Sequence, residues 1–170
     1  MNFMGKVVSF SVGSYLVYKL ANGPSQLRYE RYLTLQPESK FTGLLAYNFF
    51  HTDAMSLAFN MAVMSSLGRY TYQTMGQNKF IQLFGMGALG SALFCGVTAY
   101  RYSDFSAAGM MGPSAALISY HFFANPSWIK VWHFNPTMCF ALFVFYSFLY
   151  NDQAALGGLS AGYLAFLMAM

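Results

Sequence analysis

The chain has 170 residues, of which nine are Lys or Arg and five are Asp or Glu, and 56% of its residues are hydrophobic. Soluble domains carry about a quarter charged residues, so a chain with only 8% cannot cover its surface with charge. These figures exclude an ordinary soluble enzyme, a nucleic-acid-binding protein and a disordered tail. They predict a single polytopic membrane domain with short loops.

Six apolar stretches, the candidate membrane spans, follow one another along the chain. The first covers residues 4–21, and Lys6 and Lys19 lie near its ends, where long side chains reach the membrane interface. It contains no small-residue cleavage site, so we expect a span rather than a secretory signal. The chain is therefore expected to fold as an all-α bundle of six transmembrane helices in one domain, residues 1–170. The other five spans cover residues 51–68, 80–100, 106–124, 136–150 and 153–170.

Residues 22–50 connect the first two spans. This segment contains Pro24 and Pro37 and mixes apolar with charged side chains. Such a pattern is typical of a helix that lies in the plane of the membrane interface. We therefore expect an interfacial connection here rather than a seventh span.

Basic and acidic residues are divided unequally between the two sides of the predicted bundle. With six alternating spans, one side holds four basic residues and no acidic one, whereas the other holds five basic and five acidic residues. Anionic head groups account for the net charge of +4 more simply than nucleic acid does. The four residues on the basic side are candidate contacts for anionic phospholipids such as cardiolipin, and they are Lys6, Arg69, Lys79 and Lys130.

Polar residues inside membrane spans are costly, and each is a candidate for function. The second span contains Ser56 and Asn60, which are four residues apart and so share one helix face. The fourth span contains the small-residue segment Gly112-Pro113-Ser114 near its start, and Gly112 is expected to serve helix packing. The last span contains Gly158 and Gly162, a G-x-x-x-G pair that lets a neighbouring helix approach closely.

In their order and spacing, these segments resemble the rhomboid superfamily of intramembrane proteins. The resemblance covers almost the whole chain and includes the interfacial connection, a turn at Gly76, the G-x-S segment and the final G-x-x-x-G. In active rhomboids the serine of the G-x-S segment is the nucleophile, and a histidine three and seven residues before the two glycines is the base. The resemblance therefore implies the six-helix fold and assigns the nucleophile position to Ser114.

The base position of this resemblance falls on Ala155, whose methyl group cannot accept the proton of Ser114. The family's oxyanion-binding histidine in the second span falls on Ser56, which leaves Asn60 as the matching side-chain donor. These four residues thus form a degenerate rhomboid site, and we expect a pseudoenzyme without a catalytic residue. Their polar side chains are then expected either to bond across helix contacts or to line a retained groove that binds a helix or a lipid.

The three histidines are not expected to replace the missing base. His121 lies seven residues after Ser114, about 10 Å along the same helix, and we expect it to bond a carbonyl of a neighbouring helix. His51 and His133 lie near span ends and are expected to form hydrogen bonds at the membrane interface. No two histidines have metal-ligand spacing and neither cysteine has partners for a metal site, so we expect no metal and no cofactor.

Three functions are open on these observations. The first is a catalytically inactive rhomboid-like subunit of a larger membrane complex, with other membrane subunits and phospholipids as partners and neither nucleic acid nor a small-molecule substrate. The mitochondrial inner membrane is the favoured location, in a respiratory-chain complex or a protein translocase, and the endoplasmic reticulum is the alternative. The second function is a client-binding pseudoprotease similar to the derlins. The third is an active intramembrane serine protease.

Overall fold

The computed structural model describes residues 3–36, 43, 46–102, 106–124, 140, 141, 143–145 and 152–170, and within these residues the fold is helical. A single antiparallel β-bridge joins Leu35 to Ala107 within this part of the chain. The all-α class predicted from the sequence is therefore confirmed for the described residues. The helical elements are α1 (Phe3–Leu20), α2 (Gly23–Leu33), α4 (Ala54–Val63), the π-helical turn η1 (Met64–Gly68), α5 (Arg69–Arg101), α6 (Met111–Ala124) and α8 (Gln153–Leu167).

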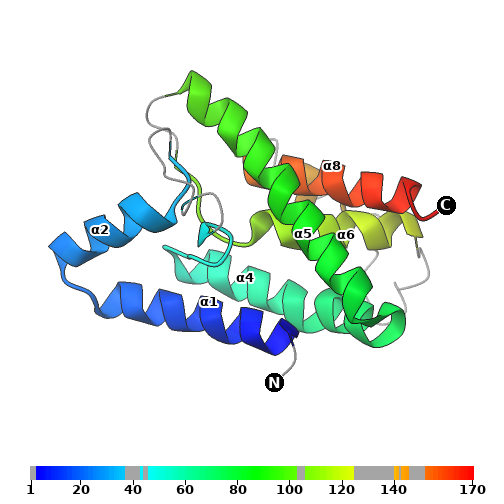
Figure 1. Ribbon diagram of the computed structural model, residues 1–170, viewed down its shortest axis with the longest axis horizontal. Helices are drawn as coiled ribbons and strands as arrows, with labels where there is room; N and C mark the ends of the chain where they lie inside the picture. The colour runs from blue at the N-terminus through cyan, green and yellow to red at the C-terminus, as the bar shows by residue number, and fades with distance from the viewer. Residues whose placement is uncertain are drawn as a thin grey trace.

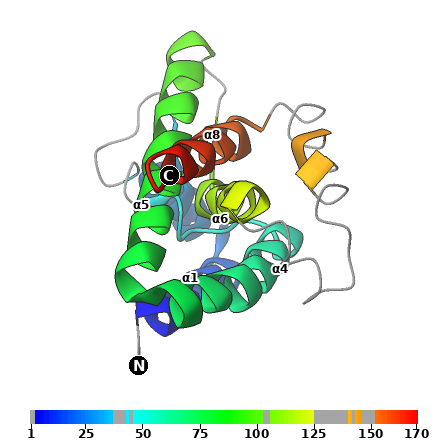
Figure 2. The same ribbon diagram turned by 90° about the vertical axis from the view of Figure 1, so that its right-hand side faces the viewer.

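Helix α6 lies at the centre of the bundle. Viewed along its axis, α8 lies above it, α5 beside it and α4 below it, and α1 lies next to α4 on the side of α5 (Figure 2). Most residues of α6 are buried, and residues 112–116 near its start are Gly, Pro, Ser, Ala and Ala. Small side chains let neighbouring backbones approach closely, which explains why three helices can pack around this short element.

The second and third predicted spans form one helical run that is interrupted at Gly76. This glycine has φ +85° and ψ 169°, a conformation that L side chains rarely adopt. The chain reverses here, so that α4 and α5 run in opposite directions along the bundle (Figure 1). The turn expected at Gly76 is therefore present. Residues 68–80, predicted to connect the two spans, are otherwise helical. No proline interrupts the helix before Gly76.

One helical run among the described residues, Ala54–Arg101, is long and apolar enough to cross a membrane. Gly76 divides it into two arms, and the apolar helix α8 is shorter. By length and apolarity, the six spans predicted from the sequence are therefore not confirmed within the described residues. Most of the predicted span 136–150 lies outside the described residues.

The remaining helix bounds differ modestly from the predicted ones. Helix α1 agrees with the predicted span 4–21 to within one residue at each end. Helix α6 begins at Met111 rather than residue 106, since Gly109 has φ +102° and the chain before it runs as irregular backbone. Helix α8 ends at Leu167, and the last residues form a turn.

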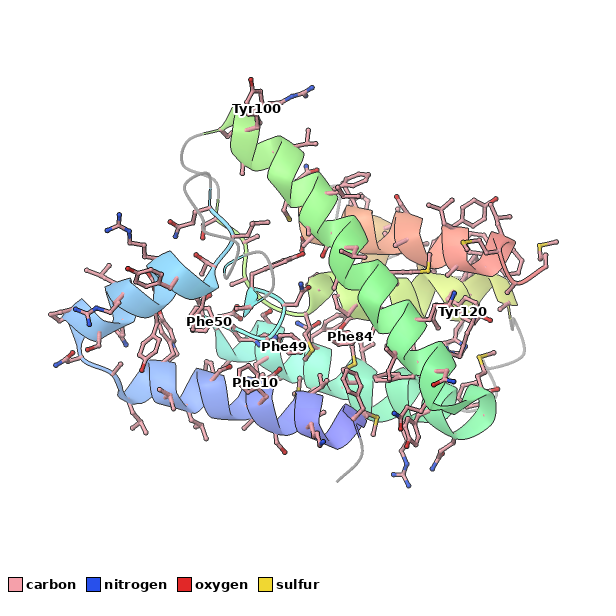
Figure 3. All side chains as sticks on the ribbon, in the orientation of Figure 1. Phe10, Phe49, Phe50, Phe84, Tyr100 and Tyr120 are labelled. Carbon is pink, nitrogen blue, oxygen red and sulfur yellow. The ribbon has the colours of Figure 1, made fainter. Side chains whose placement is uncertain are left out.

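The connection between α1 and α4 combines a surface helix with a buried end. Helix α2 has no buried residue, which is consistent with a helix lying on the outside of the bundle. Tyr47 and Phe50, by contrast, are almost completely buried. Phe49 packs against Phe10 of α1 and Phe84 of α5, with ring centroids 5.7 Å apart in both pairs (Figure 3). The end of the connection therefore belongs to the core and fixes where α4 begins.

Candidate functional site

The hydroxyl group of Ser114 and the side-chain amide of Asn60 meet between α6 and α4. Ser114 Oγ donates a hydrogen bond to Asn60 Oδ1 over 2.6 Å, and both residues are 0% exposed. A hydroxyl and an amide buried in an apolar bundle need partners, because an unpaired buried polar group costs about 1–3 kcal/mol. The structure thus brings together two residues that the sequence placed in one degenerate site.

The orientation of the Asn60 amide is determined by Ser56, the third residue of that site. Asn60 Nδ2 donates to the backbone carbonyl of Ser56 over 2.9 Å, and it lies 3.4 Å from Ser56 Oγ. A carbonyl oxygen only accepts, so the atom facing it must be the amide nitrogen. The amide oxygen then faces Ser114, and the hydroxyl proton of Ser114 is donated to it.

His51 completes this network from the residues just before α4. Its ring is 0% exposed, and its Nε2 atom lies 3.4 Å from Asn60 Nδ2 and accepts the backbone N–H of Met110 over 3.4 Å. Both neighbours are donors, so Nε2 carries no proton in this arrangement. The sequence predicted a hydrogen bond at the membrane interface for His51. The structure instead buries it, because the backbone that leads into α6 packs directly onto its ring.

Gly109 allows this close approach. A Cβ atom at its position would lie 3.1 Å from Ser56 Oγ and 3.3 Å from His51 Cδ2, and its φ of +102° disfavours a side chain. The carbonyl of Met110, the residue that donates its N–H to His51, in turn accepts the backbone N–H of Ser114. Through Met110, His51 therefore fixes the position of the first turn of α6, which contains Ser114. Nothing in the residues next to Gly109 indicates its positive φ, which is why this contact was missed.

Ala155 lies in the first turn of α8 and is 0% exposed. It packs in one apolar cluster with Ala115, Phe143 and Leu159, and its backbone N–H donates to Asp152 Oδ1 over 3.0 Å. Ala155 presents no atom that can accept a proton, and apolar side chains fill its surroundings. The position assigned to the base is thus part of the hydrophobic core.

Glycines make the contacts between α6 and α8. A Cβ atom on Gly158 would lie 2.2 Å from the carbonyl oxygen of Gly112, and one on Gly162 would lie 2.3 Å from that of Ala116. A Cβ atom on Gly112 would lie 2.2 Å from Ser91 Oγ of α5. Three of the residues predicted to serve helix packing therefore lie where helix backbones touch. Ser119 Oγ adds a hydrogen bond to the Leu159 carbonyl over 2.8 Å.

The comparison with protein families bears on this arrangement. A model of the Rhomboid domain matches residues 38–170. The chain belongs to the rhomboid family. A search of curated proteins found no match. The matched region contains α4, α5, α6 and α8, and with them Ser56, Asn60, Ser114 and Ala155.

A second buried histidine of this rhomboid lies away from Ser114. His121 Nε2 lies 2.6 Å from Thr71 Oγ1, and the rings of Tyr70 and Tyr120 meet its ring edge-on. The sequence predicted a helix carbonyl as its partner, and the structure provides the Thr71 hydroxyl instead, which itself donates to the Leu67 carbonyl. His121 therefore joins α6 to α5. His133 lies outside the described residues, and no group of three metal-ligating side chains occurs within the described ones.

The basic residues proposed as lipid contacts lie on the outside of the rhomboid. Lys6 and Arg69 are exposed, whereas Lys79 is partly buried, with its Nζ atom 4.9 Å from the centroid of the Tyr120 ring. Lys130 lies outside the described residues. Lys79 is thus held in a defined position by a cation–π contact.

A polar cavity opens beside the buried network. Its volume is about 410 Å³, and it lies next to the network because Thr52 follows His51 and Ala108 precedes Gly109 in the chain. Glu30, which also lines it, accepts a hydrogen bond from the Tyr18 hydroxyl. The described residues that line the cavity are Glu30, Thr34, Gln36, Thr52, Ser106 and Ala108.

Proposed function

We propose that this rhomboid is a non-catalytic accessory subunit of a larger membrane complex. The observation that carries the proposal is the pairing of the Ser114 hydroxyl with Asn60, at a site where the base position is the buried Ala155. A rhomboid that keeps its fold but not its proton acceptor retains a scaffold, and a scaffold of packed helices is suited to binding other subunits.

The chemistry of serine nucleophiles supports this reading. A serine hydroxyl is a weak nucleophile at neutral pH and needs an adjacent base to take its proton. Here its proton is donated to an amide oxygen, which has negligible basicity. The amide N–H groups of Asn60 are also engaged, by Ser56 and by His51, so they do not point to where an oxyanion would form.

The proposed location is the mitochondrial inner membrane, in a respiratory-chain complex or a protein translocase, with other membrane subunits and phospholipids as partners. The endoplasmic reticulum is the alternative. Fractionation of cells that express an epitope-tagged chain, followed by protease protection of purified mitochondria, tests the location on its own.

Native electrophoresis tests the assembly. Membranes containing the tagged chain are extracted in a mild detergent, and the tagged species is excised and identified by mass spectrometry. We expect the chain to migrate with fixed partners, in a particle far larger than 19.0 kDa. The variant Ser114→Ala serves as the control and is expected to assemble equally well. Migration of the wild-type chain as a monomer would contradict the proposal.

A derlin-like client-binding pseudoprotease is the second candidate, and the polar cavity beside the site favours it. A photo-crosslinking amino acid at Ser106, on the rim of this cavity, distinguishes the two functions. The accessory-subunit proposal predicts the same few crosslinked neighbours in resting and translation-arrested cells. Crosslinks to many short-lived membrane proteins, which disappear when synthesis stops, would support the client-binding function and contradict the first.

A further inference from the structure

The charged residues of the described part of the chain lie unevenly along the bundle. The described acidic residues are Glu30 of α2, Asp53 before α4 and Asp152 before α8. These residues lie at one end of the bundle, whereas the N-terminus of α1 and the turn at Gly76 within α5 lie at the opposite end (Figure 1). The latter end carries Lys6 and Arg69, and no acidic residue among those described.

Aromatic contacts bring together the segments that carry Lys6 and Lys79. Phe3 of α1 packs edge-on against Phe80 of α5, with ring centroids 6.2 Å apart. Phe80 follows Lys79, and Lys6 lies one helical turn after Phe3. The Lys79 ammonium is held over Tyr120, which lies beside the start of α5 (Figure 3).

The surface next to these cations is apolar. Helix α5 carries exposed apolar side chains from Ile81 to Leu93 and on towards Tyr100 at its other end (Figure 3). A phospholipid has the matching shape, with a phosphate at one end and acyl chains beneath it. A nucleic acid or an acidic peptide would match the cations but would leave the apolar side chains of α5 in water.

We propose that Lys6, Arg69 and Lys79 form a binding surface for the head groups of anionic phospholipids in the leaflet at this end of the bundle. Lys79 is the fixed element of the surface, since the Tyr120 ring restrains it before a lipid arrives. Lys6 and Arg69 are exposed and complete the positive field. This proposal is independent of whether Ser114 is catalytic and of which complex the chain joins.

The test uses the full-length chain, purified in a neutral detergent, with native mass spectrometry to count bound lipids. The probes are dioleoyl phosphatidylglycerol and, for the uncharged comparison, dioleoyl phosphatidylcholine. The test variant combines Lys6→Gln, Arg69→Gln and Lys79→Gln. The matched control combines Lys19→Gln, Arg28→Gln and Arg101→Gln, which removes the same charge from the opposite end.

Each basic residue at an anionic surface is expected to change the affinity about fivefold. Three such residues together correspond to about 100-fold, so the test variant should bind phosphatidylglycerol about 100-fold more weakly than the wild type. The control variant should bind it less than about threefold more weakly. Lys79→Arg keeps the positive charge and should bind phosphatidylglycerol like the wild type. This result would show that the charge at position 79, and not a disturbance caused by substitution there, determines the affinity. Equal losses in both triple variants, or equal binding of the two lipids by the wild type, would overturn the proposal.

Discussion

Ser114 Oγ donates a 2.6 Å hydrogen bond to Asn60 Oδ1, and this bond joins the helix that would carry a rhomboid nucleophile to the helix that would carry its oxyanion donor. The backbone carbonyl of Ser56 orients the amide, and His51 lies behind it. The same two residues that would act on a substrate in a protease act here on each other. In this rhomboid the two residues are therefore part of the packing between α4 and α6.

A double-mutant cycle measures this pairing. Hydrogen bonds between membrane helices contribute about 0.6 kcal/mol on average and up to about 1.7 kcal/mol. We expect Ser114→Ala and Asn60→Ala to show a coupling free energy towards the upper end of that range, because both residues are completely buried. Unfolding in detergent micelles, followed by circular dichroism, gives the four stabilities. A cycle with Ser65→Ala in place of Ser114→Ala is the control, since Ser65 is exposed and bonds only to Ala62. Coupling at Ser114 no larger than at Ser65 would refute the pairing.

Restoring the base should not restore the enzyme. Ala155 is 0% exposed and packs with Ala115, Phe143 and Leu159, so the imidazole of Ala155→His has no space. Overpacking of a buried position costs about 1–3 kcal/mol, and we expect a correspondingly lower Tm and no proteolysis of a transmembrane test substrate. The control is Ser160→His on the exposed side of α8, which should leave Tm nearly unchanged. An Ala155→His variant with the wild-type Tm and proteolytic activity would show that the site is intact apart from the base.

Substitution of glycine by alanine should lower the stability at a helix contact and leave it unchanged or raise it at open positions. Gly158 has no room for a Cβ atom, which would lie 2.2 Å from the Gly112 carbonyl oxygen, so Gly158→Ala should destabilise the bundle by about 1–3 kcal/mol or more. A Cβ atom added to Gly85 or Gly96 of α5 would meet no other atom within 4 Å, so alanine there should be neutral or stabilising by up to about 1 kcal/mol. Thermal unfolding of the three variants compares them. Equal effects would mean that α6 and α8 are not in backbone contact.

Much of the fold followed from the sequence because its signals are local. The apolar run of α1, the turn at Gly76 and the G-x-x-x-G pair of α8 are each encoded within a few neighbouring residues. The grouping of Ser114 with Asn60 came from the rhomboid resemblance rather than from local patterns, since 54 residues separate them.

The burial of His51 could not be predicted for the same physical reason. Its partner, the N–H of Met110, lies 59 residues away and reaches it only because Gly109 adopts a positive φ. The extension of the second span beyond residue 68 was also missed. Arg69 and the polar residues after it do not prevent a helix, and packing of Thr71 against His121 stabilises one.

The stability of the protein should depend on pH through Asp152, which caps α8. Burial raises the pKa of this carboxyl above its ordinary value of 3.8, although the backbone N–H groups of Ala155 and Ala154 oppose the shift. The folded state therefore holds the proton more tightly than the unfolded state does. The contribution of Asp152 to the free energy of unfolding is greatest below pH 3.8 and is lost as the pH rises through the folded pKa.

Two variants separate the charge of Asp152 from its capping role. Asp152→Asn keeps a side-chain oxygen for the Ala155 N–H, so it should remove the pH dependence and retain the cap. Asp152→Ala should remove both and lose a further ~1 kcal/mol at every pH. Tm measured from pH 3.5 to 7 provides the comparison. A wild-type profile that Asp152→Asn leaves unaltered would assign the pH dependence to another group.

The loss of catalysis is the central claim, and labelling of Ser114 by a fluorophosphonate tests it most directly. Native membranes that contain the chain are treated with the probe, beside membranes that contain an active rhomboid protease, and the Ser114 peptide is examined by mass spectrometry. We predict that the active protease is modified and that Ser114 is not, because its proton is donated to Asn60 and Ala155 accepts none. Modification of Ser114 that disappears in Ser114→Ala would contradict the account and establish an activated serine at this site.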